Sequence, residues 1–95
     1  MGKPLRVLIV EDVPDDAELV VLELRRAGYD PVSERVETAA AMRAALERGP
    51  WDLVLSDNSL PQFDAAAALR LLRELDLDLP FIVVSGSIGE DVAVA

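Results

Sequence analysis

Cysteine and histidine are both absent from this sequence. Without cysteine the chain can form no disulfide, no thiolate metal site and no Cys nucleophile. Without histidine, zinc sites of the usual type and a Ser-His-Asp triad are excluded as well. Long apolar runs are also lacking, so we expect no signal peptide, no membrane-spanning helix and a cytoplasmic location.

Basic residues are scarce. The chain has 9 Lys and Arg against 18 Asp and Glu, which gives a net charge of -9. Binding to a nucleic-acid backbone requires clustered Lys and Arg, so we expect no direct nucleic-acid contact and, for the same reason, no anionic membrane surface as partner. The acidic balance instead favours cations and basic partners. With 95 residues the chain suits one domain, spanning 1–95.

Strand-like and helix-like patterns alternate along the chain. Apolar, β-branched runs predict strands, and apolar residues at helical spacing predict the helices between them. The predicted strands are 5–10, 31–36, 51–56 and 80–84, and the predicted helices are 14–27, 39–48 and 65–75. A capping-box spacing at 87–90 predicts the start of a further helix at Asp91. Strands joined by crossover helices indicate an α/β fold with a doubly wound parallel sheet.

Acidic residues follow two of the predicted strands. Glu11 and Asp12 come directly after the first strand, and Asp57 follows the third. Ligands of open parallel sheets bind beyond the carboxyl ends of the strands, where the strand order reverses. If the first strand is central, three carboxylates meet there and repel one another, unless a hard cation such as magnesium binds among them. Taken singly, each acid could equally be a solvated loop residue.

The same acids belong to a set of motifs in a fixed order. Glu11-Asp12, then Asp-Asn-Ser-Leu-Pro-Gln-Phe-Asp at 57–64, then Val-Val-Ser-Gly at 83–86, closely resembles the receiver domains of two-component response regulators. The resemblance implies a flavodoxin-like fold with strand order 2-1-3-4. It also implies a phosphorelay module, not a metabolic enzyme, that receives a phosphoryl group from a sensor histidine kinase or a histidine phosphotransfer protein.

The resemblance implies a role for each matching residue. Asp57 is similar to the phosphoacceptor, a carboxylate nucleophile that forms an acyl phosphate. Asp12 and Asp57 would bind magnesium, supported by Glu11 and by the backbone carbonyl of Ser59. Ser85 would hydrogen-bond the phosphoryl group, although by itself it could be an ordinary turn serine.

The sequence departs from the family pattern toward its end. Receivers continue with the rest of a fourth helix, a fifth strand carrying a site lysine and an aromatic, and a fifth helix, and none of these follows here. Lys3 is not in a position to replace that lysine. We therefore expect a truncated fold, a fragment of a longer receiver, lacking the fifth strand and fifth helix. The fourth strand, 81–84, would be an open apolar edge through which the chain self-associates.

Two leucines of the first predicted helix point away from its apolar face. Leu19 and Leu22 are offset from the stripe that faces the sheet, whose members are Ala17, Val20, Val21 and Leu24. They could be ordinary surface residues. Because this helix commonly helps to dock the phosphohistidine donor in receivers, we predict that they form part of a partner-binding patch.

Other functions fit the motifs less well. A haloacid-dehalogenase-like phosphatase has a second acid two residues after a nucleophile on the first strand, but Asp12 is followed by Val13-Pro14. A flavodoxin-like cofactor binder would need a phosphate-binding loop at that position, where the acids would repel phosphate. A pseudo-receiver that only binds partners is disfavoured by the intact acids and favoured by the missing lysine.

Overall fold

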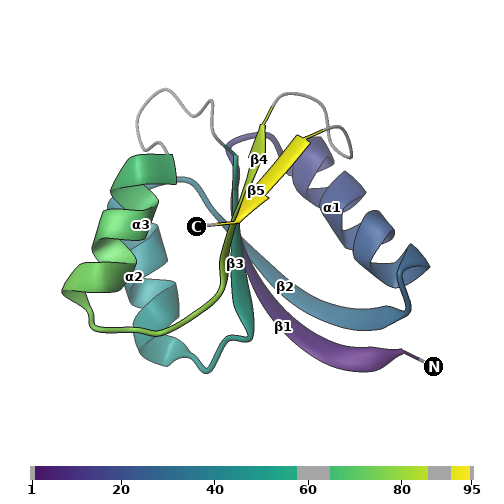
Figure 1. The fold of residues 1–95 in the computed structure, drawn as a ribbon, viewed down its shortest axis with the longest axis horizontal. Coiled ribbons are helices and arrows are strands. Elements are labelled where there is room, and N and C mark those ends of the chain that lie inside the picture. Colours follow the sequence, from purple (N-terminus) through teal and green to yellow (C-terminus); the bar gives the residue numbers. More distant parts are fainter. Residues whose placement is uncertain (1, 58–64, 86–90, 95) are drawn as a thin grey trace.

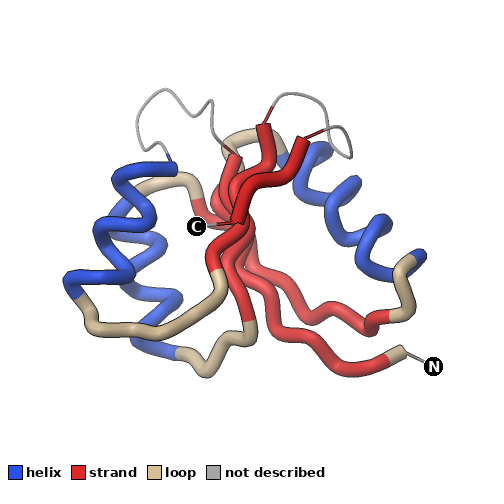
Figure 2. Tube along the Cα trace, in the orientation of Figure 1, coloured by secondary structure: helices blue, strands red, loops and turns tan. Residues whose placement is uncertain are grey.

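The computed structural model describes residues 2–57, 65–85 and 91–94, with the backbone alone described at 57, 84, 85 and 91–94. Figures 1 and 2 show how helices and strands alternate along the chain. The elements are β1 (Lys3–Val10), α1 (Pro14–Arg26), β2 (Tyr29–Val36), α2 (Ala39–Arg48), β3 (Leu53–Asp57), α3 (Ala65–Glu74), β4 (Phe81–Ser85) and β5 (Asp91–Val94). None of the helices within the described part is long and apolar enough to cross a membrane.

The strands form one sheet in the order β2-β1-β3-β4-β5. The first four of these are parallel, which confirms the predicted order 2-1-3-4 and makes the polar strand β2 an edge. Two helices, α2 and α3, cover one face of the sheet, whereas α1 lies on the other (Figure 1). The layers are therefore those of a doubly wound α/β domain.

The inner strand β1, between β2 and β3, has buried side chains on both faces of the sheet. Leu8 and Val10 point into a core under α2 and α3, and Val7 and Ile9 point into a smaller core under α1. Successive side chains of a strand alternate between faces, so a central strand covered on both sides requires a nearly continuous apolar run. Phe81 and Met42 are among the largest fully buried side chains and lie in the α2–α3 core.

The helix boundaries follow local signals in the sequence. Pro14 occupies the first turn of α1, and Gly28 follows the helix with a φ of 99°, a left-handed conformation that favours glycine. At the start of α2 the Thr38 hydroxyl accepts a hydrogen bond from the backbone N–H of Ala41 at 3.1 Å, as its N-cap position predicts. Asp64, the residue that precedes α3, lies outside the described residues.

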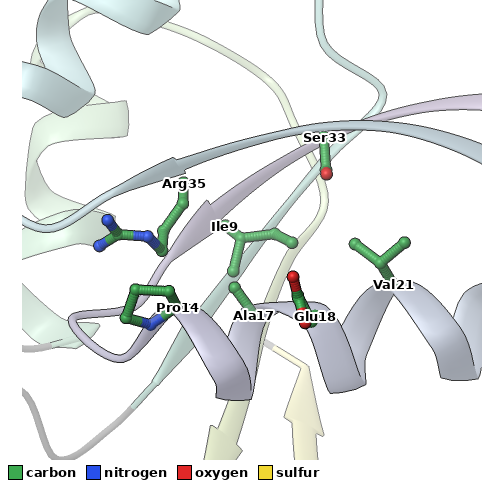
Figure 3. Close-up of a pocket in the computed structure, with 7 residues that line it drawn as sticks. All are labelled: Ile9, Pro14, Ala17, Glu18, Val21, Ser33 and Arg35. Atoms are coloured by element: carbon green, nitrogen blue, oxygen red, sulfur yellow. The ribbon is translucent and has the colours of Figure 1, made fainter.

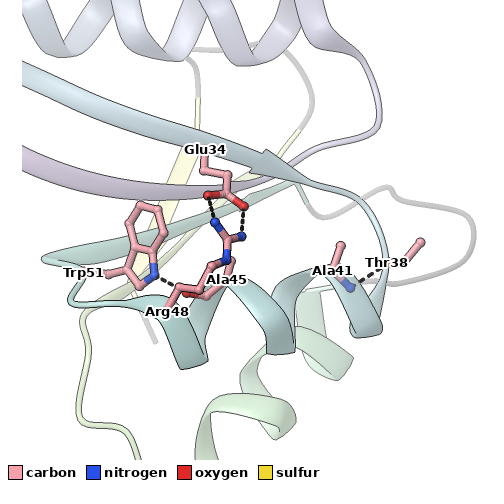
Figure 4. Close-up of polar contacts among 6 residues, drawn as sticks. All are labelled: Glu34, Thr38, Ala41, Ala45, Arg48 and Trp51. Atoms are coloured by element: carbon pink, nitrogen blue, oxygen red, sulfur yellow. Dashed lines mark hydrogen bonds and ion pairs between the residues drawn. The ribbon is translucent and has the colours of Figure 1, made fainter.

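Polar contacts join α2 to the loop before β3 and to the edge strand β2 (Figure 4). The Trp51 indole N–H donates to the carbonyl of Ala45 at 2.8 Å, and the ring packs against the α2–α3 core. The guanidinium of Arg48 donates to both carboxylate oxygens of Glu34 on β2. This hydrogen-bonded pairing with Glu34 raises the pKa of Arg48 above its usual value.

The prediction of a helix from Asp91 was wrong. The segment Asp91–Val94 forms the strand β5, which pairs antiparallel with β4. Valines alternate in this segment, a strand-like pattern, and β4 offers unpaired backbone groups along its outer side. Pairing with β5 satisfies those groups and also covers the edge of β4, so the predicted self-association through an exposed fourth-strand edge loses its basis. The capping-box residues 87–90 lie outside the described part.

Candidate functional site

The carboxyl ends of β1, β3 and β4 lie side by side. Val10 pairs with Ser56 across β1 and β3, and Asp57 pairs with Val84 across β3 and β4. One residue beyond Val10 is Glu11, so the backbones of Glu11 and Asp57 stand at the same level of the sheet. The expectation that the first and third strands end next to each other is confirmed, and it rests on β1 being central.

Glu11 is held firmly at the end of β1. Its backbone N–H donates to the carbonyl of Val36 at 2.9 Å, which extends the β1–β2 pairing by one residue. Its side chain is buried, with 6% exposed, and one carboxylate oxygen accepts from the backbone N–H of Val13 at 3.1 Å. The carboxylate therefore turns back onto the residues that lead into α1, while the next residue, Asp12, is exposed to solvent.

The other predicted site residues are described only in part. Asp57 ends β3 and Ser85 ends β4, both known through the backbone, and Ser59 lies outside the described residues. Within the side chains that are described, no group of three His, Cys, Asp or Glu could hold a metal ion. The predicted trio includes the Asp57 side chain, which lies outside that set, so the predicted roles stay predictions.

The donor chemistry at this edge nevertheless suits a hard cation. The side chains at the ends of β1 and β3 are carboxylates, and carboxylate and carbonyl oxygens are the protein ligands that magnesium takes. The chain has no His or Cys, so it lacks the imidazole and thiolate ligands that favour zinc or copper. The residues therefore fit a magnesium ion at the acidic edge.

Sequence reasoning missed one residue at this edge, Arg35. It lies one position before the end of β2, and its Nη1 donates to the Glu11 carbonyl at 3.1 Å. The same nitrogen is 3.8 Å from a carboxylate oxygen of Glu37. No sequence pattern marks this contact, because its acceptor is a backbone carbonyl 24 residues away in the chain.

The predicted partner patch on α1 is exposed. Leu19 and Leu22 have 48% and 50% of their surface accessible, whereas Ala17 is buried against the sheet. They are three residues apart on one helix, so they are neighbours on its surface. Their outward placement is as predicted.

Comparison with known proteins identifies the family. Residues 7–95 match the response regulator receiver domain, so the chain belongs to this family of two-component signalling proteins. It is 34% identical over 90 residues to the transcriptional regulatory protein PrrA of Mycobacterium tuberculosis, which covers 95% of this chain and 38% of that protein. It is 33% identical over 85 residues to the two-component response regulator ORR41 of Oryza sativa, covering 87% of this chain and 67% of that protein.

Solved structures agree with this family. The receiver domain of a sensor histidine kinase from Pseudomonas aeruginosa matches with a TM-score of 0.66 and 26% identity, covering 96% of this chain and 74% of that one. That domain was solved with a magnesium ion coordinated in its active-site cleft. The chain spans only about two fifths of the length of relatives such as PrrA.

Proposed function

We propose that this receiver domain accepts a phosphoryl group on Asp57 from a phosphohistidine donor, with magnesium bound at the acidic edge. The donor would be a sensor histidine kinase or a histidine phosphotransfer protein. The observation that carries the proposal is the placement of the Glu11-Asp12 turn level with Asp57, at adjacent ends of parallel strands. The module would switch partner interactions and would not be a metabolic enzyme.

The chemistry follows from the groups at that edge. A carboxylate oxygen of Asp57 attacks the phosphorus while the bond from phosphorus to the donor imidazole nitrogen breaks, and the electron pair leaves with that nitrogen. Bound magnesium would supply positive charge against the equatorial phosphoryl oxygens. Asp12 and Asp57 would hold the ion with Glu11 in support, Ser59 would add its backbone carbonyl, and Ser85 would donate its hydroxyl to the phosphoryl group.

Electrostatics explains why the acids need a cation. Two carboxylates about 4 Å apart repel by roughly 1 kcal/mol in water and by more where solvent is partly excluded. Glu11 is already buried, so its charge is poorly screened by water. The magnesium in the receiver from Pseudomonas supports the same solution for this chain.

Mass spectrometry of the intact protein tests the proposal. The protein is incubated with a small phosphodonor such as acetyl phosphate and magnesium chloride, and we expect the mass of one added phosphoryl group. The Asp57→Asn variant should gain none, and EDTA should suppress labelling of the wild type. Asp78→Asn, which removes an exposed acid from the loop between α3 and β4, is the matched control and should label normally. Labelling of Asp57→Asn, or labelling that survives EDTA, would contradict the proposal.

A further inference from the structure

Arg35 places a cation beside the acidic turn. It pairs in register with Ile9, and its side chain lies on the α1 side of the sheet, next to Pro14 at one end of a groove of about 280 Å³ (Figure 3). From there its guanidinium reaches the Glu11 carbonyl at 3.1 Å and the Glu37 carboxylate at 3.8 Å. One side chain from the edge strand thus contacts the residue on which the proposed metal site depends.

The position is electrostatically unusual. The N-terminal end of a helix carries partial positive charge, so a cation near the start of α1 is unfavourable unless acids or carbonyls offset it. The first turn of α1 contains Asp15 and Asp16, and Glu37 lies within ion-pair distance of Arg35. Hydrogen bonds from a charged donor are about twice as strong as neutral ones, so the bond to the Glu11 carbonyl is a firm contact.

Glu11 forms hydrogen bonds at its N–H, its carbonyl and its carboxylate. Glu11 donates its N–H to Val36, accepts Arg35 on its carbonyl, and accepts the Val13 N–H on its carboxylate. The bond to Val36 fixes the end of β1, and the bond from Val13 closes the turn. The bond from Arg35 restrains the Glu11–Asp12 peptide, which lies between these two contacts. The turn that carries Glu11 and Asp12 is therefore restrained without any metal.

We infer that Arg35 is a positioning residue for divalent-cation binding, acting by restraining the Glu11 peptide; this rests on the proposed function. Its charge and its contact have opposite effects on the cation. The positive charge repels a second cation, so a purely electrostatic residue at this position would weaken binding. A restrained turn strengthens binding, because the acids need not be ordered when the ion arrives. The sign of the change on substitution separates these two effects.

Magnesium titration followed by amide NMR shifts provides the test. For Arg35→Met we expect about tenfold weaker magnesium binding, the lower end of the range for partners that orient metal ligands. Without metal, the amide hydrogens of Glu11 and Val13 should exchange faster in this variant. Arg35→Lys keeps the charge but loses the planar guanidinium, and it should fall between Arg35→Met and the wild type. Arg43→Met removes the same charge from an exposed pair with Glu74 and should change neither result.

The results distinguish failure of the proposed function from failure of the proposed role of Arg35. If the wild type shows no magnesium binding, the proposed function fails, whereas the exchange rates still report whether Arg35 restrains the turn. If the wild type binds and Arg35→Met binds equally or more tightly, the inference is overturned and the proposed function stands. Unchanged exchange at Val13 in Arg35→Met overturns it as well.

Discussion

Replacing both outward leucines of α1 with serine should weaken donor docking. Full burial of a leucine side chain is worth about 1.5–3 kcal/mol. Leu19 and Leu22 are each about half exposed, so docking would bury the exposed half of each side chain. That burial is worth about half of the full value for each leucine, or about 2 kcal/mol together. Since 1.4 kcal/mol corresponds to a tenfold change, the Leu19→Ser/Leu22→Ser variant should bind its donor about 30-fold less tightly.

Phosphotransfer kinetics can separate docking from chemistry. The initial rate of transfer from a phosphorylated histidine kinase, measured below saturation, should fall by that factor, whereas labelling by acetyl phosphate should be unchanged because it needs no docking surface. Val32→Ser is the matched control: this exposed apolar residue, 55% accessible, lies on the opposite side of the sheet from α1. A double variant that transfers at the wild-type rate, or that loses both reactions equally, would refute the reasoning.

Two further predictions concern the fold. Phe81→Ala should lower the free energy of unfolding by about 3–5 kcal/mol, because loss of this fully buried ring leaves a cavity in the α2–α3 core. Phe81→Leu should lower it by less than about 1.5 kcal/mol. Urea unfolding followed by circular dichroism measures both, and equal losses would contradict the cavity argument. Thr38→Ala should cost about 1 kcal/mol in the same assay through loss of the bond to the Ala41 N–H, while Thr38→Ser, which keeps the hydroxyl, should cost much less.

Most of the fold could be predicted because buried positions are occupied by apolar residues at spacings typical of strands and helices. The run that ends at Val10 is apolar on every residue from 7 to 10, as a strand covered on both faces must be. Boundaries set by pairing show no such spacing. Tyr29 and Asp30 belong to β2 because they pair with Lys3 and Pro4, whereas Trp51 lies outside β3 and its indole N–H donates to Ala45 of α2.

The candidate site was predictable where topology determines it. Acids that follow neighbouring parallel strands must share one edge of the sheet, so the placement of Glu11 and Asp57 followed from strand order. Arg35 could not be found this way, since it acts on a backbone carbonyl and any residue type at position 11 would offer one. The strand β5 was missed because a local helix-capping pattern competed with pairing to β4, which only the folded sheet makes available.

Within the described residues, α1 is the one helix on its side of the sheet, and it leaves part of that face uncovered. Leu53 and Ile82 lie next to the α1 core yet remain only partly buried. An apolar segment packed over them would remove further surface from water and stabilise the folded state by mass action. The melting temperature of the domain would then rise with the concentration of that segment. A melting temperature of this chain therefore depends on whether such a segment is present.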